Sequence, residues 1–133
     1  MRVDGRCHCG AISYEAEVDP EATILCHCTD CQTLTGSAYR VIVRAPAATF
    51  VLRGTPTIYV KTADSGTKRA HAFCPVCGSP VYATAAVPNP PLYSLRVGTL
   101  RQRAALQPRR QQWCASSLPW SMSLESLEKL DRQ

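Results

Sequence analysis

Seven of the eight cysteines fall into three short groups, and their thiols are the side chains best suited to chemistry. The groups read Cys7-His8-Cys9, Cys26-His27-Cys28-Thr29-Asp30-Cys31 and Cys74-Pro75-Val76-Cys77. Thiolates two or three residues apart can bind one zinc ion if the chain turns between them, since sulfur ligands of tetrahedral zinc lie roughly 3.8 Å apart. The spacings therefore predict metal sites.

The first and third groups share a glycine directly after their second cysteine. Glycine adopts positive φ at little steric cost, so Gly10 and Gly78 each suit the tight turn that brings two thiols onto one metal. Two such pairs complete a four-thiolate site, and closed zinc sites of this kind are structural. We therefore predict a structural zinc ion with four ligands: Cys7, Cys9, Cys74 and Cys77.

The middle group has three cysteines, no glycine directly behind them and no fourth cysteine nearby. Three protein ligands with an open fourth position is the arrangement of catalytic zinc. Zinc lowers the pKa of a bound thiol, so the open position suits a substrate thiol that reacts as thiolate. We predict a catalytic zinc site at Cys26, Cys28 and Cys31, hence two Zn²⁺ ions per chain, of which this second ion is the more easily lost.

Other interpretations of the middle group stay open from the residues alone. It could be a second structural site completed by a fourth ligand, or it could hold an iron–sulfur cluster, although its spacing matches neither common ferredoxin pattern. By proximity, His27 and Asp30 are candidate proton carriers. Cys114 stands apart as a spectator or as a reactive thiol. The candidate fourth ligands are His8, His27, Asp30, His71 and Cys114.

Length and composition favour one domain inside the cell. The 133 residues suit a single zinc-binding unit over 1–133, with a core over about 2–120 and a C-terminal tail over 121–133. The first residues, MRVDGRCHCG, lack the apolar region of a signal peptide, and no run approaches the ~20 apolar residues of a membrane span. We expect a cytoplasmic protein, because the cytosol keeps thiols reduced and free to bind metal.

The basic charge of the chain does not predict a nucleic-acid interface. The formal net charge of +5 counts no cysteine, and seven metal-bound thiolates would leave the chain only mildly basic. A nucleic-acid surface needs a contiguous basic face, whereas the densest basic group is interrupted by Gln and Ala. That group is Arg101, Arg103, Arg109 and Arg110. We expect no nucleic-acid and no membrane partner, and a weak positive charge suits a small anionic substrate.

Period-two patterns dominate the segments that must position these cysteines, and they predict strands. Helical spacing occurs only at residues 123–130, where three leucines share one side. Residues 29–35 suit one or two helical turns, with Thr29 as cap and Gly36 as stop. Many short strands predict an all-β domain of antiparallel sheets, with one short C-terminal helix. The predicted strands cover residues 11–18, 23–25, 39–43, 50–52, 57–61, 68–73, 81–84 and 92–97.

Three motifs together resemble the glutathione-dependent formaldehyde-activating (GFA) family, which includes the GFA domain of centromere protein V. They read GRCHCGA at residues 5–11, CHCTDC at residues 26–31 followed by Gly36-Ser37, and FCPVCGS at residues 73–79. The resemblance runs from about Arg2 to Val97, and more loosely to Trp120. It implies the Mss4-like fold of small antiparallel sheets and two zinc sites. The implied structural ligands are Cys7, Cys9, Cys74 and Cys77, and the implied catalytic ligands are Cys26, Cys28 and Cys31.

The resemblance also implies a carbon–sulfur lyase. In the condensation direction, glutathione or a similar small thiol joins formaldehyde to give S-hydroxymethylglutathione. We expect the thiol to occupy the open zinc position, where its sulfur attacks the aldehyde carbon. Two alternatives come from other classes: a zinc-stabilised binding module of Mss4-like fold without catalysis, and a thiol-redox enzyme that uses Cys114.

Overall fold

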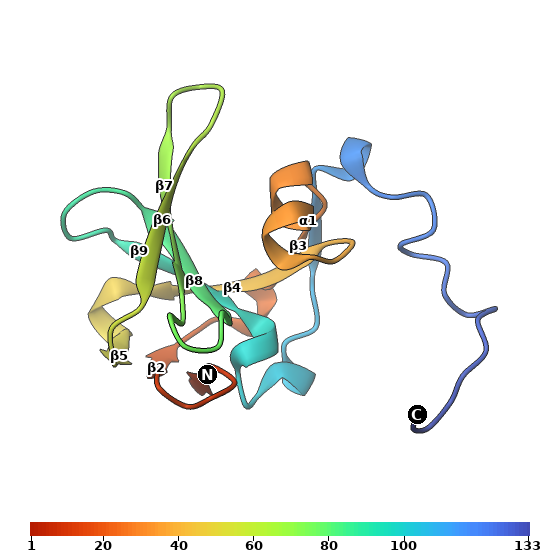
Figure 1. Ribbon diagram of the computed structural model, residues 1–133, viewed down its shortest axis with the longest axis horizontal. Coiled ribbons are helices and arrows are strands. Elements are labelled where there is room, and N and C mark those ends of the chain that lie inside the picture. The colour runs from red at the N-terminus through yellow and green to blue at the C-terminus, as the bar shows by residue number, and fades with distance from the viewer.

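The computed structural model describes residues 1–133 as two β-sheets, one short α-helix and an extended C-terminal segment (Figure 1). The smaller sheet has the strand order β1-β2-β5, and the larger has the order β10-β3-β4-β9-β8-β7-β6. The smaller sheet consists of β1 (Arg2–Arg6), β2 (Ser13–Glu17) and β5 (Val51–Arg53). The larger consists of β3 (Ile24–Cys26), β4 (Arg40–Pro46), β6 (Thr57–Thr62), β7 (Lys68–Phe73), β8 (Pro80–Ala85), β9 (Leu92–Arg96) and β10 (Arg110–Gln112).

The α-helix is α1 (Thr29–Thr35), which directly follows β3. Five single-turn 3-10 helices join the other elements: η1 (Pro20–Ala22), η2 (Ala47–Thr49), η3 (Val97–Thr99), η4 (Arg103–Ala105) and η5 (Cys114–Ser116). None of these helices has the length and apolar character that a membrane crossing requires.

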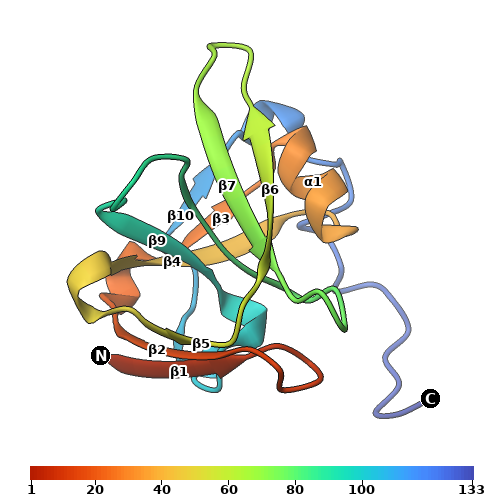
Figure 2. The ribbon, with the colours of Figure 1, turned by 60° about the vertical axis from the view of Figure 1, so that its left-hand side comes forward.

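The hydrophobic core lies between the two sheets. Figure 2 shows β1, β2 and β5 below β4 and β9. The face of the first predicted strand is buried as its alternation implies, from Ile12 through Tyr14 and Ala16 to Val18. These residues join Val43 of β4, Val81 and Tyr82 of β8 and Leu95 of β9 in one cluster of 16 buried residues. The cluster fixes the small sheet against the large one.

The all-β class is confirmed, and each predicted strand appears within a few residues of its expected position. The two strands that the pattern missed, β1 and β10, are short and largely polar. They are strands because neighbours pair with them: β1 with β2 antiparallel, and β10 with β3 parallel. The larger sheet is therefore mixed rather than wholly antiparallel.

The C-terminal helix expected over residues 123–130 does not form. The segment contains only turns and bends, and Leu124, Leu127 and Leu130 stay exposed. A helix of eight residues is not stable in water unless its apolar side packs on something, and this segment runs away from the sheets in both ribbon views (Figures 1 and 2). The prediction of a C-terminal helix from its helical spacing was therefore wrong, whereas the predicted helical turns at residues 29–35 form α1.

Candidate metal centres and the adjoining pocket

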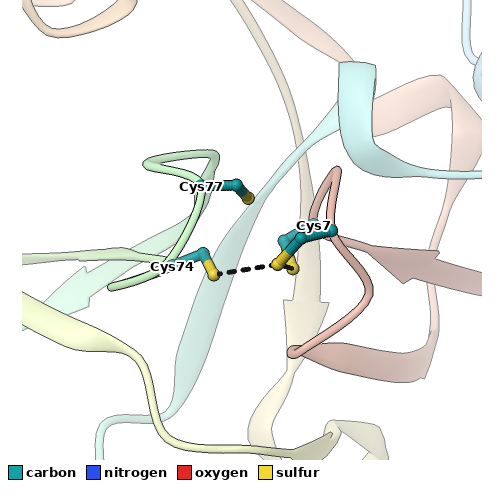
Figure 3. A group of neighbouring side chains, drawn as sticks. Cys7, Cys74 and Cys77 are labelled. Atoms are coloured by element: carbon teal, nitrogen blue, oxygen red, sulfur yellow. Dashed lines mark hydrogen bonds between the residues drawn. The ribbon is translucent and has the colours of Figure 1, made fainter.

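Two hairpin loops bring four cysteine thiols together, one loop from each sheet. Cys7 and Cys9 lie between β1 and β2, and Cys74 and Cys77 lie between β7 and β8. The four sulfurs lie within 4.8 Å of one another, with 3.6 Å between Cys7 and Cys9 and 3.7 Å between Cys9 and Cys74. Figure 3 shows Cys74 and Cys77 of one loop pointing toward Cys7 of the other. This spacing is close to the roughly 3.8 Å between sulfurs on tetrahedral zinc.

Local backbone geometry explains how these loops bring their sulfur atoms together. The predicted turn glycines both adopt positive φ, 85° at Gly10 and 74° at Gly78. The amide of Ile12 donates to the Cys7 sulfur over 3.2 Å, and hydrogen bonds from amides stabilise a thiolate. The Ser79 hydroxyl, 3.2 Å from the Cys77 sulfur, and nearby backbone groups lower the pKa of Cys77 to about 5. The four residues therefore fit a closed zinc site, which we call the four-cysteine site.

The remaining three clustered cysteines meet where β3 ends and α1 begins; we call them the triplet. Cys26 is the last residue of β3, and Cys28 and Cys31 flank the first turn of α1. Their sulfurs also lie within 4.8 Å of one another. Here the helical turn, rather than a glycine, brings the ligands together. The residues present therefore offer zinc three thiolates.

The helix that shapes the triplet is capped by a cysteine. Cys28 has extended backbone geometry, and its sulfur accepts a hydrogen bond from the amide of Cys31 over 3.2 Å. The expected cap, Thr29, is instead the first residue within the helix. Gly36 ends α1 in the left-handed conformation, with φ 62°, as predicted. One side chain thus caps α1 and supplies a candidate ligand.

None of the five candidate fourth ligands lies with the triplet sulfurs. The fully buried His27 uses its Nε2 in a 2.8 Å hydrogen bond with Gln111 Oε1. Asp30 forms an ion pair with Lys61 Nζ at 2.5 Å. The other candidates also lie outside the group: His8, His71 and Cys114.

Two cations lie next to the triplet. Arg40 is the direct partner of Cys26 in the β3–β4 ladder and is only 5% exposed. Burial lowers the pKa of Arg40, and the neighbouring Cys31 thiolate opposes that shift. Asp30 raises the pKa of Lys61, and the nearby Cys28 thiolate acts in the same direction. Both side chains offset the negative charge of three clustered thiolates.

A pocket of about 290 Å³ opens beside the triplet and shares Arg40 with it. Its other basic side chains are His71 of β7 and Arg96 of β9. The rest of the wall is formed by Leu34, Tyr59, Ala72, Phe73, Gly78 and Pro80. An Arg96 Nη2 group donates to His71 Nδ1 over 3.2 Å. Burial, and then the charges of Arg96 and Arg40, lower the pKa of His71 to about 4. His71 is therefore neutral near pH 7, with its proton on Nε2 because Nδ1 accepts a hydrogen bond.

Sequence reasoning missed both arginines of this pocket. Each stands within an otherwise apolar strand segment, Tyr39-Arg40-Val41-Ile42 and Leu95-Arg96-Val97. Arginine is rarely fully buried unless it is paired, so a lone guanidinium within an apolar strand segment is a signal for a site. From the sequence, His71 was considered only as a candidate fourth metal ligand.

Comparison with known proteins identifies the family. The model of the family described as glutathione-dependent formaldehyde-activating enzyme matches residues 2–116. A solved structure of a Rhodobacter sphaeroides protein, a structural genomics target, is similar in fold, with a TM-score of 0.61 and 23% identity. The match covers 81% of this chain and 98% of that chain. No curated protein matches the sequence. With both cysteine groups inside the matched region, the chain belongs to the glutathione-dependent formaldehyde-activating enzyme family.

Proposed function

We propose that this protein joins a small thiol, glutathione or a similar one, to formaldehyde at the triplet. The product is the S-hydroxymethyl thiol, and in the reverse direction the enzyme is a carbon–sulfur lyase. The observation that carries the proposal is a group of three cysteine sulfurs, without a fourth protein ligand, beside a pocket. The family match supports glutathione and formaldehyde as the substrates.

Cys26, Cys28 and Cys31 would hold the zinc ion, which would supply a fourth position for a thiol and favour the thiolate form of that thiol near neutral pH. Three thiolate ligands also favour attack by sulfur over hydrolysis, because hydrolytic zinc sites use more neutral ligands. The sulfur forms a bond to the carbonyl carbon of formaldehyde while the π electron pair of the carbonyl group moves to its oxygen. The oxygen then takes up one proton, which balances the proton that the thiol lost. Arg40 and Lys61 keep the negative charge of the thiolate group tolerable inside the protein.

The hydrogen-bond donor for the developing alkoxide is, in this proposal, His71. It lines the pocket, is neutral near pH 7 and carries its proton on Nε2. The proton carriers considered from sequence do not line this pocket: His27 is fully buried, with its Nε2 bonded to Gln111, and Asp30 pairs with Lys61. A neutral imidazole can stabilise an alkoxide by a hydrogen bond or transfer a proton to it.

The proposal is tested by NMR measurement of formaldehyde consumption with and without glutathione, on zinc-loaded protein. We expect a glutathione-dependent rate in the wild type that falls to the uncatalysed rate in Cys28→Ser. The matched control is Cys114→Ser, whose exposed thiol belongs to neither cysteine group, and it keeps the wild-type rate. A wild type no faster than the uncatalysed reaction overturns the proposal.

Two further outcomes point to the alternatives. Loss of activity in Cys114→Ser with both zinc ions retained supports the thiol-redox enzyme. X-ray absorption that finds four sulfurs around every zinc ion, in protein free of added thiol, supports the binding module without catalysis. The proposal instead requires fewer than four sulfurs per zinc on average until a thiol is added.

A further inference from the structure

Two arginines of the pocket are buried without an acidic partner. Arg40 is 5% exposed and Arg96 is 6% exposed, and the Nε atom of each lacks a hydrogen-bond partner. Neither takes part in any of the six ion pairs of the structure. A buried guanidinium that lacks an anion is costly, so such groups are found where an anion binds.

The charges around the two arginines are unequal. Arg40 faces the negative triplet, which supplies it with counter-charge. The charges that act on Arg96 are mixed: the cations Arg40 and Arg69 lower its pKa, and Cys31 of the triplet partly opposes them. Its hydrogen-bond partner His71 is neutral. Arg96 is therefore a buried cation whose counter-charge within the protein is incomplete, since no carboxylate pairs with it and two cations lie near it.

The ladder places the two guanidinium groups together. Arg96 of β9 pairs directly with Ile42 of β4, so Arg40 is its diagonal neighbour on the same sheet face. Both line the pocket of about 290 Å³, which is near the lower end of ligand pockets, roughly 300–1,000 Å³. Such a space suits one small acidic group held against two guanidinium groups.

The larger cleft over the small sheet does not show the same feature. Its volume is about 1010 Å³, but three of its arginines already have acidic partners. Arg2 and Arg53 pair with Glu15, and Arg101 pairs with Asp4. All three side chains are mostly exposed, so solvent also compensates their charge. The buried pair in the smaller pocket is the stronger indication of a bound anion.

We propose that Arg96, with Arg40 beside it, binds a carboxylate of the thiol substrate. This inference rests on the function proposed above and narrows its substrate class to thiols that carry a carboxylate. Guanidinium groups recognise carboxylates through paired hydrogen bonds, so the acid group would be fixed in the pocket while the sulfur lies at the triplet. Two-point binding of this kind orients the sulfur for attack.

The first experiment measures binding rather than activity. Zinc-loaded, ¹⁵N-labelled wild-type protein is titrated with 3-mercaptopropionate, with propionate and with 2-mercaptoethanol, and the arginine Nε–Hε signals are followed by NMR. We expect the Arg96 signal to shift with both carboxylates and to stay in place with 2-mercaptoethanol, which lacks the acid group. If the chemical shift of the Arg96 Nε–Hε signal changes with neither 3-mercaptopropionate nor propionate, the inference is wrong.

The second experiment uses variants. Arg96→Met should lower the preference for 3-mercaptopropionate over 2-mercaptoethanol roughly 10- to 100-fold, the usual range for hydrogen bonds to a charged group. Arg96→Lys should retain part of the preference, because lysine keeps the positive charge but lacks the paired N–H donors of a guanidinium group. The matched control is Arg44→Met, an exposed arginine on the same strand as Arg40, which should keep the full preference.

The outcomes separate this inference from the proposed function. Equal wild-type affinity for the two thiols overturns the carboxylate site, even if the condensation activity is present. A clear carboxylate preference in a protein that condenses no thiol with formaldehyde overturns the proposed function and leaves the carboxylate site standing. If Arg96→Met does not fold, Arg96→Lys and the wild-type titration decide the question.

Discussion

His71 and Arg96 share a hydrogen bond, yet only one of them is charged at neutral pH. Burial lowers the pKa of both, to about 4 for His71 and, with the help of the neighbouring Arg40, to about 9 for Arg96. Between these two values the histidine stays neutral and the arginine stays cationic. The pocket therefore keeps a constant charge over the physiological range, with a hydrogen-bond donor on His71 Nε2 and the two cations Arg40 and Arg96.

This difference predicts how stability depends on pH. An unfolded histidine takes up a proton below about 6.5, whereas folded His71 does so only near pH 4. The unfolded state thus binds more protons in that window, so the free energy of unfolding falls as the pH falls from about 6.5 to about 4. We expect His71→Gln to make this fall shallower, which urea unfolding at pH 7.5 and 5.5 would measure.

The matched control for that prediction is His8→Gln, whose side chain is exposed. Protonation of the metal-binding thiolates destabilises all three proteins alike, so only the difference between slopes is informative. If His71→Gln and wild type lose the same free energy between the two pH values, folded His71 is not held neutral.

At the scale of elements, sequence reasoning succeeded where the geometry is local. Gly10 and Gly78 follow their cysteines directly, and both take the positive φ that the ligand turns require. It failed where partners come from distant segments. β10 is a strand only because β3 is beside it, and Arg40 meets Cys26 only through the register of the β3–β4 ladder. No local pattern encodes such pairings, so the pocket arginines could not be placed in advance.

One turn glycine sits against the loop that carries Cys9. Gly54, which follows β5, has φ 90°, and a Cβ atom there would lie 2.4 Å from the carbonyl oxygen of Ala11. Gly66 has nearly the same φ, 87°, but its Cβ would meet nothing within 4 Å. An alanine at position 66 would therefore add backbone strain alone, whereas an alanine at position 54 would add the same strain and a steric overlap.

We expect Gly66→Ala to destabilise the protein by about 1–2 kcal/mol, the usual cost of left-handed geometry for an L-residue. Gly54→Ala carries the same strain plus overlap with backbone, and should cost about 2–5 kcal/mol. Urea unfolding of both variants measures the difference, and zinc content reports whether the Cys9 loop has moved. Equal destabilisation by the two substitutions would show that the small sheet moves aside without cost.

At the scale of the whole molecule, the four-cysteine site and the triplet differ in which parts of the chain they connect. The four-cysteine site connects the β1–β2 loop of the small sheet with the β7–β8 loop of the large one. Two of its thiols, Cys7 and Cys74, are fully buried members of the core cluster. The triplet lies within one continuous stretch, from the end of β3 into α1, and its residues are partly exposed. The sequence prediction of one site made by all four of these cysteines already requires the N-terminal segment to lie beside the middle of the chain, because neither pair can close a four-ligand site alone.

These positions predict that chelation removes metal in two steps. A chelator should first take zinc from the triplet, with little change in structure, because β3 stays paired with β4 and β10 through backbone hydrogen bonds. It should then take zinc from the four-cysteine site together with loss of folding, since metal binding at structural sites contributes about 10 kcal/mol or more to folding. A chelator titration followed by a zinc-sensitive dye and by circular dichroism in the same sample measures both steps.

The matched variant for this titration is Cys28→Ser, which should lack the first step and keep the second. In the wild type, we expect roughly half of the zinc to leave before the dichroism changes, and the rest to leave with the unfolding transition. Release of all zinc from a protein that remains folded would contradict a structural role for the four-cysteine site, because the core alone would then hold the small sheet in place. Release of all zinc in the single unfolding step would show that the triplet metal is as strongly coupled to folding as the other, which does not fit a position kept open for substrate.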